Sequence, residues 1–148
     1  MRRPKPPAPV TGSADDVEIE FYEALQRGDI DRLMALWSDD DEIACVHPGG
    51  PRLVGAPAIR ASFDAMFANG SIDARPERVR RLDAHSTAVH SVLERIRILT
   101  SEGERFAWVI ATNVYVKSAQ GWRLVAHHAS PGTSAEVQDV AEAASILH

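Results

Sequence analysis

Histidine side chains are the groups in this sequence best suited to moving protons near neutral pH. His47 lies in the segment Val46-His47-Pro48. Because histidine has the unperturbed pKa closest to neutrality, His47 is a candidate proton shuttle. The alternative is that its ring hydrogen-bonds a neighbouring backbone group and only shapes the Pro-Gly-Gly turn that follows. Both interpretations stay open.

Two further histidines, His127 and His128, are adjacent in the last strand-like segment. Neighbouring residues of a strand face opposite sides of a sheet. If Trp122 and Leu124 point to the interior, His128 does so too, and His127 points to a partner subunit or to solvent. We therefore expect His128 to share an interior site with His47. The donors expected to orient a ligand there are His128, Asn113 and Thr112.

Metal and thiol chemistry have weaker support. A metal site needs three or more converging ligands, and the sequence has no HxH or HExxH spacing. No metal and no cofactor are therefore expected. Cys45 shares a strand face with His47, but a nucleophilic thiolate would need an accessible and stabilising cleft. A small buried apolar residue is the better interpretation of Cys45.

The three tryptophans are large apolar groups with one hydrogen-bond donor each. Their spacing places them among core positions, and lining a pocket is compatible with that. The residues predicted to contact a ligand are Trp37, Trp108, Thr112, Asn113 and Trp122.

Apolar spacing changes along the chain from helical to strand-like. Caps and glycine stops delimit a first helix between Ser13 and Gly28 and a second one after Asp29. A short strand over 43–47, a helix over 58–68 and strands over 78–84, 87–99, 105–117 and 122–130 follow.

Helices followed by a strand meander predict an α+β fold with helices on one face of a curved sheet. Residues 1–13 are basic and rich in proline, which predicts a disordered tail without the apolar core of a signal peptide. The domain is expected to span 14–131. Residues 132–148 form a C-terminal tail in which a short docking helix is predicted.

The composition excludes several classes of function. The 148 residues carry a net charge of −5, which argues against nucleic acid as a partner, and no apolar run is long enough for a membrane helix. The single cysteine fits a reducing cytoplasm. The segment 106–116 is apolar on both faces, and a second subunit is the obvious cover for the outer one.

Several segments in order resemble the SnoaL-like branch of the nuclear transport factor 2-like superfamily. They are Phe21-Tyr22-Glu23-Ala24-Leu25-Gln26-Arg27-Gly28-Asp29, Leu36-Trp37-Ser38-Asp39-Asp40-Asp41, Val46-His47-Pro48-Gly49-Gly50, Gly55-Ala56-Pro57-Ala58-Ile59 and Gly121-Trp122-Arg123-Leu124-Val125-Ala126-His127-His128-Ala129-Ser130. The resemblance implies a cone-shaped, strongly curved mixed or antiparallel sheet wrapped around the N-terminal helices. It also implies an apolar pocket at the open end and a homodimer formed through the outer sheet face.

Ketosteroid isomerases belong to the same superfamily, and the resemblance places His47 where they carry a catalytic aspartate. Such enzymes also need an oxyanion hole made by a tyrosine and a protonated aspartate. The corresponding positions hold Phe21 and Thr112, while Tyr22 is expected to point elsewhere on its helix. Steroid isomerase chemistry is therefore not expected.

The sequence favours a protein with a pocket for a small organic ligand and no assigned biochemical role. One alternative is an acid–base enzyme of the isomerase, cyclase or hydratase type that acts on a carbonyl compound through His47. The other alternative is a protein-interaction module without chemistry.

Overall fold

The first helix has strong start and stop signals. In this computed structural model, which describes residues 12–132, α1 spans Ala14–Arg27. The Ser13 side chain accepts a hydrogen bond from the Asp16 amide, and Gly28 ends the helix with a left-handed backbone, at φ 65°. These signals fix the rotation of α1, so that Val17, Phe21 and Leu25 are buried.

Two shorter helices follow. Asp29 caps α2 (Ile30–Ala35), and α3 (Ala56–Phe67) begins with a proline in its first turn, where a missing amide hydrogen costs nothing. Between them lies a small hairpin of β1 (Ala44–Val46) and β2 (Arg52–Val54). β1 matches the predicted strand, whereas β2 was not predicted.

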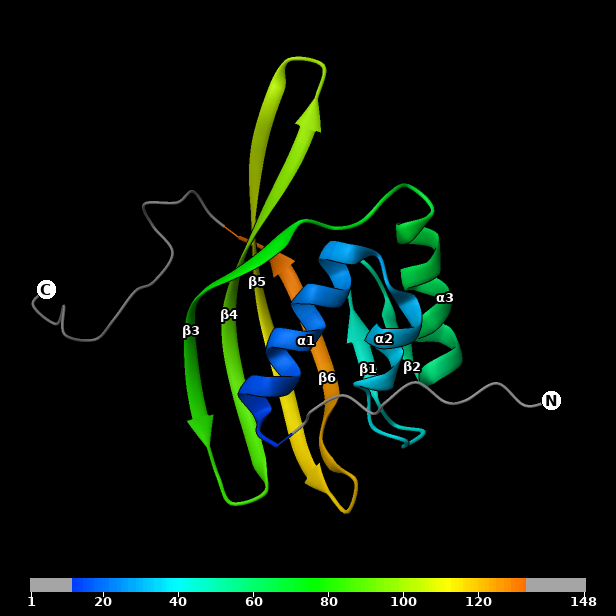
Figure 1. The fold of residues 1–148 in the computed structure, drawn as a ribbon, viewed down its shortest axis with the longest axis vertical. Helices are drawn as coiled ribbons and strands as arrows, with labels where there is room; N and C mark the ends of the chain where they lie inside the picture. Colours follow the sequence, from blue (N-terminus) through cyan, green and yellow to red (C-terminus); the bar gives the residue numbers. More distant parts are fainter. Residues whose placement is uncertain (1–11, 133–148) are drawn as a thin grey trace, which may run out of the picture.

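The second half of the chain forms a long antiparallel meander. Its strands are β3 (Ala74–Asp83), β4 (Thr87–Thr100), β5 (Gly103–Ser118) and β6 (Gly121–Pro131). The complete sheet has the order β2-β1-β6-β5-β4-β3, and the β1–β6 pair is parallel. The predicted α+β class with a mixed, curved sheet is confirmed (Figure 1).

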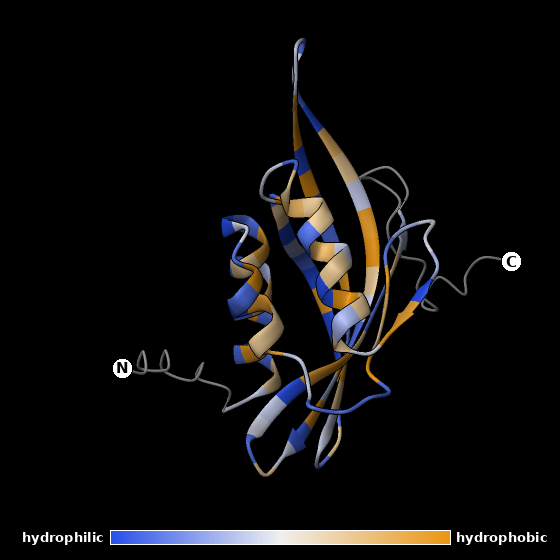
Figure 2. Ribbon diagram, turned by 90° about the vertical axis from the view of Figure 1, so that its right-hand side faces the viewer, coloured by the Kyte–Doolittle hydropathy of each residue, from blue (hydrophilic) through white to orange (hydrophobic). Residues whose placement is uncertain are grey.

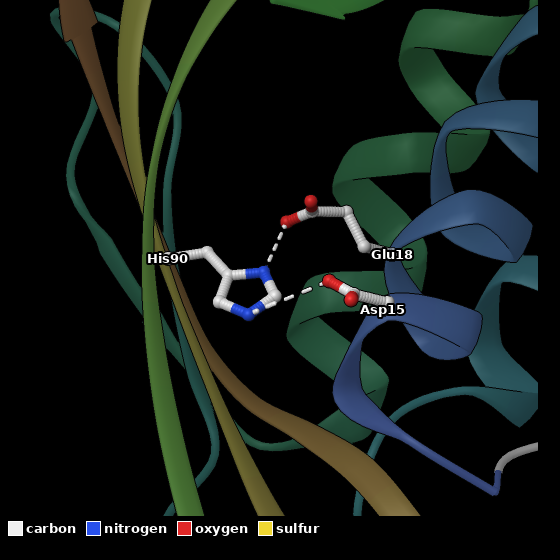
Figure 3. A group of neighbouring side chains, drawn as sticks. All are labelled: Asp15, Glu18 and His90. Atoms are coloured by element: carbon white, nitrogen blue, oxygen red, sulfur yellow. Dashed lines mark hydrogen bonds and ion pairs between the residues drawn. The ribbon is translucent and has the colours of Figure 1, made fainter. Parts of the chain in front are cut away.

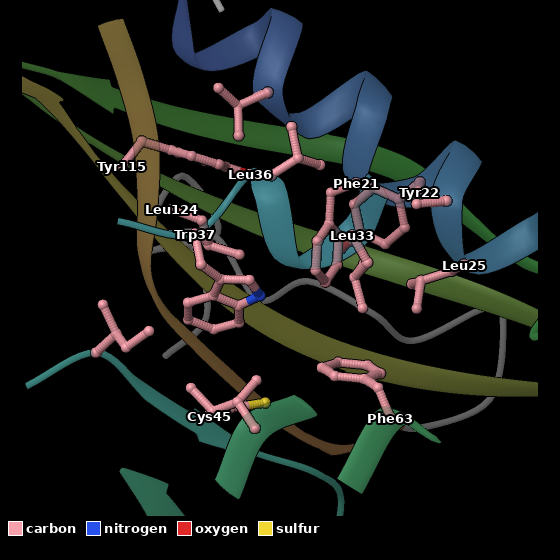
Figure 4. Close-up of a cluster of buried hydrophobic side chains, with 14 of the residues drawn as sticks. Phe21, Tyr22, Leu25, Leu33, Leu36, Trp37, Cys45, Phe63, Tyr115 and Leu124 are labelled. Carbon is pink, nitrogen blue, oxygen red and sulfur yellow. The ribbon is translucent and has the colours of Figure 1, made fainter. Parts of the chain in front are cut away.

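The core lies between α1 and the inner face of the sheet. α1 crosses in front of the sheet, with α2 and α3 beside it over the β1–β2 end (Figures 1 and 2). Phe21 is fully buried and makes edge contacts with Tyr22 and Phe63. Figure 4 shows Leu33, Leu36, Trp37 and Leu124 filling the space around these rings.

A bulge in β6 changes which residues face the core. Tyr115 pairs with Leu124, but the preceding Val114 pairs with Ala126, so Val125 is an extra residue in β6. Leu124 is buried on the inner face, and beyond the bulge the inner positions are His127 and Ala129. One inserted residue has therefore exchanged the two faces of the strand.

The β4–β5 hairpin projects beyond the rest of the sheet (Figure 1). Pairing with β3 reaches only to Ile96, and pairing with β6 reaches only to Val109. The tip, residues 98–105, is therefore a ribbon of two strands. The predicted N-terminal tail up to residue 11 and the helix suggested after residue 132 lie outside the described residues.

Candidate functional site

Four polar side chains form a hydrogen-bonded row between α1 and the sheet. The Tyr22 hydroxyl donates to Glu94 Oε2 at 2.7 Å, and Asn113 Nδ2 donates to the Tyr22 oxygen at 3.1 Å. His127 Nδ1 lies 2.5 Å from Asn113 Oδ1. Because the Asn113 amide nitrogen donates to Tyr22, its oxygen is the acceptor for His127. All three hydrogen bonds therefore point from His127 towards Glu94.

Burial decides the protonation of the two acids in this row. Burial is the main cause that raises the pKa of Glu94 from 4.5 to about 7, the nearby Glu18 adds to the rise, and the hydrogen bond from Tyr22 opposes it. Burial and the adjacent Glu94 raise the pKa of Tyr22 well above its ordinary value. At neutral pH, Glu94 is thus poised between its acid and its carboxylate form.

The interior histidine is His127, which corrects the prediction for His128. His127 is buried against the Phe21 ring, at 5.3 Å between ring centroids, whereas His128 is exposed on the outer face. The reason is the extra residue Val125, which reverses the alternation counted from Leu124. Burial, with smaller contributions from His47 and His128, lowers the pKa of His127 from 6.5 to about 3, so its ring is neutral.

Two predicted ligand contacts lie on the outer face of β5. Thr112 is exposed and Trp108 is half-buried, and they alternate with the buried inner residues Val109, Ala111 and Asn113. Thr112 pairs with His128 across the strands. The structure therefore separates Trp108 and Thr112 from the interior, and of the donors predicted on this strand only Asn113 joins the row.

The other two tryptophans occupy different surroundings. Trp37 is buried in the core, and its backbone forms an isolated β-bridge with Leu124. Its side-chain Nε1 has no hydrogen bond among residues 12–132. Trp122 is half-buried and lines a small cavity at the N-terminal end of α1, together with Asp15 and His90. A ligand role for these two tryptophans stays a prediction.

His47 is half-buried and held by α3. Its Nε2 lies 2.9 Å from the Ser62 hydroxyl, which itself donates to the Ile59 carbonyl, so the ring nitrogen is the donor. Burial lowers the pKa of His47. Ser62 is consequently not an activated nucleophile, and the free basic nitrogen of His47 is Nδ1.

The thiol of Cys45 is not set up for chemistry. It lies 3.9 Å from His47 Nε2 and is buried, and burial raises its pKa to about 12. A thiol with such a pKa stays protonated at neutral pH. Cys45 also pairs with His127 across the β1–β6 ladder, so His47 and His127 flank the same part of the interior.

A groove of about 710 Å³ opens beside the C-terminal end of α1. Gln26, one helical turn beyond Tyr22, forms part of its wall, and so does Ile96, the next inward residue after Glu94 on β4. Tyr22 and Glu94 thus precede the two lining residues on the same elements, but they are buried and do not line the groove themselves. The remaining lining comes from the segment 69–73, Arg75 and the β4 residues 97–99.

Sequence patterns gave little warning of this arrangement. Tyr22 follows Phe21 directly, and an α-helix turns only about 100° per residue, so both can reach a broad interface. Glu94 occupies an inward position of β4. A charged residue at such a position was the one signal in the sequence that could have indicated a buried polar site.

The sequence profile of the SnoaL-like domain family matches residues 16–134 of the chain. A crystal structure from Thiobacillus denitrificans, provisionally described as a calcium/calmodulin-dependent protein kinase type II association domain, shares 35% identity over 84% of this chain and 99% of that one, with a TM-score of 0.77. A structure from Streptomyces avermitilis, provisionally described as a dehydratase of the NTF2-like family, shares 30% identity over 80% and 93%, with a TM-score of 0.71.

The chain belongs to the SnoaL-like domain family, within the NTF2-like proteins. Several similar structures of lower identity have no assigned function, including one from Pseudomonas putida with 17% identity over 86% and 89% and a TM-score of 0.69. None of the curated proteins compared with the chain matches it. Within residues 12–132, no helix has the length and apolar character needed to cross a membrane.

Proposed function

We propose that the protein binds a small organic molecule in the groove at the C-terminal end of α1. The observation that supports this most directly is the groove itself, whose volume of about 710 Å³ falls within the range typical of small-molecule sites. Ile98 and Leu99 remain 45% and 71% exposed at its wall. They would cover the apolar body of a ligand.

The charged groups at the rim favour a ligand that is largely apolar. Arg97 is already paired with Asp73 at 2.8 Å and with Glu104 at 3.0 Å, and Arg75 is paired with Asp73 at 3.0 Å. These ions satisfy one another, so a ligand gains little by supplying a further charge. Gln26 offers its side-chain oxygen for recognition, because its amide nitrogen already donates to the Ala74 carbonyl at 2.8 Å.

A thermal-shift screen of small metabolites tests this proposal, with Ile98→Ser and Leu82→Ser as matched variants. Ile98 lines the groove, while Leu82 is 73% exposed and lies elsewhere. A ligand at 100 times its Kd stabilises the fold by about 2.7 kcal/mol, which raises Tm by several degrees. We expect Ile98→Ser to weaken a hit by roughly tenfold and Leu82→Ser to leave it unchanged. Equal weakening in both variants, or no hit from any compound class, would contradict the groove as the site.

Acid–base catalysis is the second candidate, and the Tyr22–Glu94 pair favours it. A phenol beside a carboxyl group that is partly protonated at pH 7 is the combination that polarises a carbonyl oxygen or protonates a leaving group. The provisional description of the Streptomyces avermitilis structure as a dehydratase agrees with such chemistry. His47, with its free Nδ1, is the candidate base. Turnover of a bound compound that is lost in Glu94→Gln, with binding retained, would support this function.

The outer face of the sheet supports the proposal of a homodimer. Figure 2 shows that no helix of residues 12–132 lies over that face, and β5 presents Phe106, Trp108 and Ile110 there, exposed or half-buried. Related structures include proteins described as kinase hub or association domains.

The proposed location is a reducing cytoplasm, which the buried and unpaired Cys45 fits.

Light scattering on a sizing column checks the dimer with Ile110→Arg and Ile19→Arg. Ile110 lies on the outer sheet face, whereas Ile19 is exposed on α1. A charge placed inside an interface is desolvated without a partner, so Ile110→Arg is expected to elute as a monomer. Ile19→Arg is expected to elute as the wild type does. A wild-type monomer, or a dimer unaffected by Ile110→Arg, would count against this surface.

A further inference from the structure

Three side chains outside the proposed ligand groove converge at the opposite, N-terminal end of α1 (Figure 3). They are Asp15 and Glu18, which lie one turn apart on the helix, and His90 from β4. One potential ligand atom from each residue falls within 4.8 Å of the others. Glu18 and His90 are buried, while Asp15 is exposed.

The hydrogen bonds of Glu18 fix which nitrogen of His90 carries the proton. His90 Nδ1 and the Tyr115 hydroxyl both lie 2.9 Å from Glu18 Oε2. A carboxylate can only accept, so Nδ1 is the donor and the lone pair of the neutral ring is on Nε2. Glu18 therefore holds His90 in the tautomer that a metal-binding imidazole needs.

His90 Nε2 faces a small cavity without a hydrogen bond of its own. The nearest polar group, Asp15 Oδ1, is 3.9 Å away, which is too long for a hydrogen bond, and no other is made to it within residues 12–132. The His90 side chain is 1% exposed. The cavity has a volume of about 230 Å³, and Asp83 and Trp122 also line it. A buried basic nitrogen thus points into a space that carboxylates surround.

We propose that this cavity is a zinc site in which His90 Nε2 and the Asp15 carboxylate are ligands. Asp83, which also lines the cavity and is exposed, is the third ligand of this proposal, and water completes the coordination. A carboxylate that accepts the second N–H of a ligating histidine, as Glu18 does here, is the usual outer partner in zinc sites. One imidazole with carboxylates favours Zn²⁺ or a similar transition ion over Mg²⁺ or Ca²⁺.

The distance between His90 Nε2 and Asp15 Oδ1 requires only a small adjustment. Two ligand atoms bound to one tetrahedral zinc at about 2.0–2.1 Å lie roughly 3.3 Å apart. The observed 3.9 Å closes by a rotation of Asp15, whose side chain is 54% exposed. The ligands come from positions 15, 83 and 90, and for this reason no short spacing in the sequence revealed them.

Arg81 competes with a metal for Asp15. Its Nε lies 2.8 Å from Asp15 Oδ1, and both side chains are about half exposed. Such a surface ion pair contributes little, so a metal can displace it or use the other carboxylate oxygen. Removal of this competing cation in Arg81→Gln is expected to tighten zinc binding by up to about fivefold.

Calorimetric titration of the chelator-treated full chain with Zn²⁺ tests the site. We expect one equivalent to bind and Asp15→Asn to abolish this binding. The Asp15 side chain is exposed, so this variant should fold. His85→Ala is the matched control, because His85 is exposed and close in sequence to Asp83 and His90 but is not among the residues that line the cavity. It should bind zinc as the wild type does.

Glu18→Gln tests the positioning role separately from the ligands. Loss of the outer carboxylate is expected to weaken zinc binding by about 10- to 100-fold while the Co²⁺ absorption spectrum keeps its shape. The proposal is overturned if wild-type protein shows no saturable zinc binding. It is also overturned if binding survives in Asp15→Asn, or if it disappears in His85→Ala, which would mean adventitious binding at a surface histidine. Folding of each variant is verified by circular dichroism.

Discussion

Replacing Glu94 with glutamine is expected to remove a contribution of about 3 kcal/mol to the free energy of unfolding, which this side chain makes at low pH and loses between pH 4.5 and pH values above 7. Burial raises the pKa of the folded Glu94 from 4.5 to about 7. The folded state therefore holds a proton that the unfolded chain has released over this range. This contribution to stability is complete below pH 4.5 and disappears as the pH rises through 7.

Urea denaturation at a series of pH values measures this dependence. The control is Glu102→Gln on the projecting hairpin, where the carboxylate is exposed and has only a long contact to Arg105. We expect the control to keep the wild-type pH profile, and Glu94→Gln to gain stability relative to the wild type as the pH rises from 4.5 to above 7. A profile of Glu94→Gln that runs parallel to that of the wild type would show that Glu94 ionises in the folded state at an ordinary pKa.

The second large effect concerns His127 and has the opposite sign. Burial lowers the pKa of this histidine in the folded state from 6.5 to about 3. As the pH falls from 6.5 towards 3, the unfolded chain binds a proton at this histidine and the folded protein does not. The stability that His127 contributes at neutral pH is therefore lost over this range. The loss amounts to roughly 4–5 kcal/mol. His127→Gln is expected to remove most of this acid sensitivity, whatever its effect on stability at pH 7.

His128→Gln is the natural control for this experiment. His128 is the next residue in the chain but is exposed on the outer face of the sheet. We expect its acid unfolding to follow that of the wild type. If the two variants behaved in the reverse way, His128 would be the interior residue. Because Glu94 and His127 act in opposite directions between pH 4.5 and 6.5, the wild type should show a stability plateau there.

Much of the fold followed from local signals in the sequence. Ser13 and Gly28 bound the first helix by satisfying its free backbone groups, and these groups are the same in any tertiary context. The alternation in 105–117 identified β5 for a similar reason. β2 was missed because only two of its three residues are apolar, whereas β1 lies in a continuous apolar run from Ile43 to Val46.

The candidate site was only partly predictable, because it depends on how strands are aligned. Asn113, a predicted ligand contact, is buried in the hydrogen-bonded row, and His47, the predicted proton shuttle, is half-buried against α3; their functional roles stay predictions. His128 was chosen over His127 because strict alternation has no means of anticipating the extra residue at Val125. Tyr22 and Glu94 are 72 residues apart, and only the tertiary fold joins them.

The two-stranded tip of the β4–β5 hairpin gives these strands two regions of unequal local stability. Residues 98–105 pair only with each other, and an isolated ribbon of two strands is marginally stable in water. The tip can therefore open in a local unfolding step while the body of the same strands stays closed. Charged residues such as Glu104 and Arg105 along its open edges discourage pairing with foreign strands. Leu99 in the proposed ligand groove belongs to this separately opening unit, so the wall of the groove can loosen without disturbing the core.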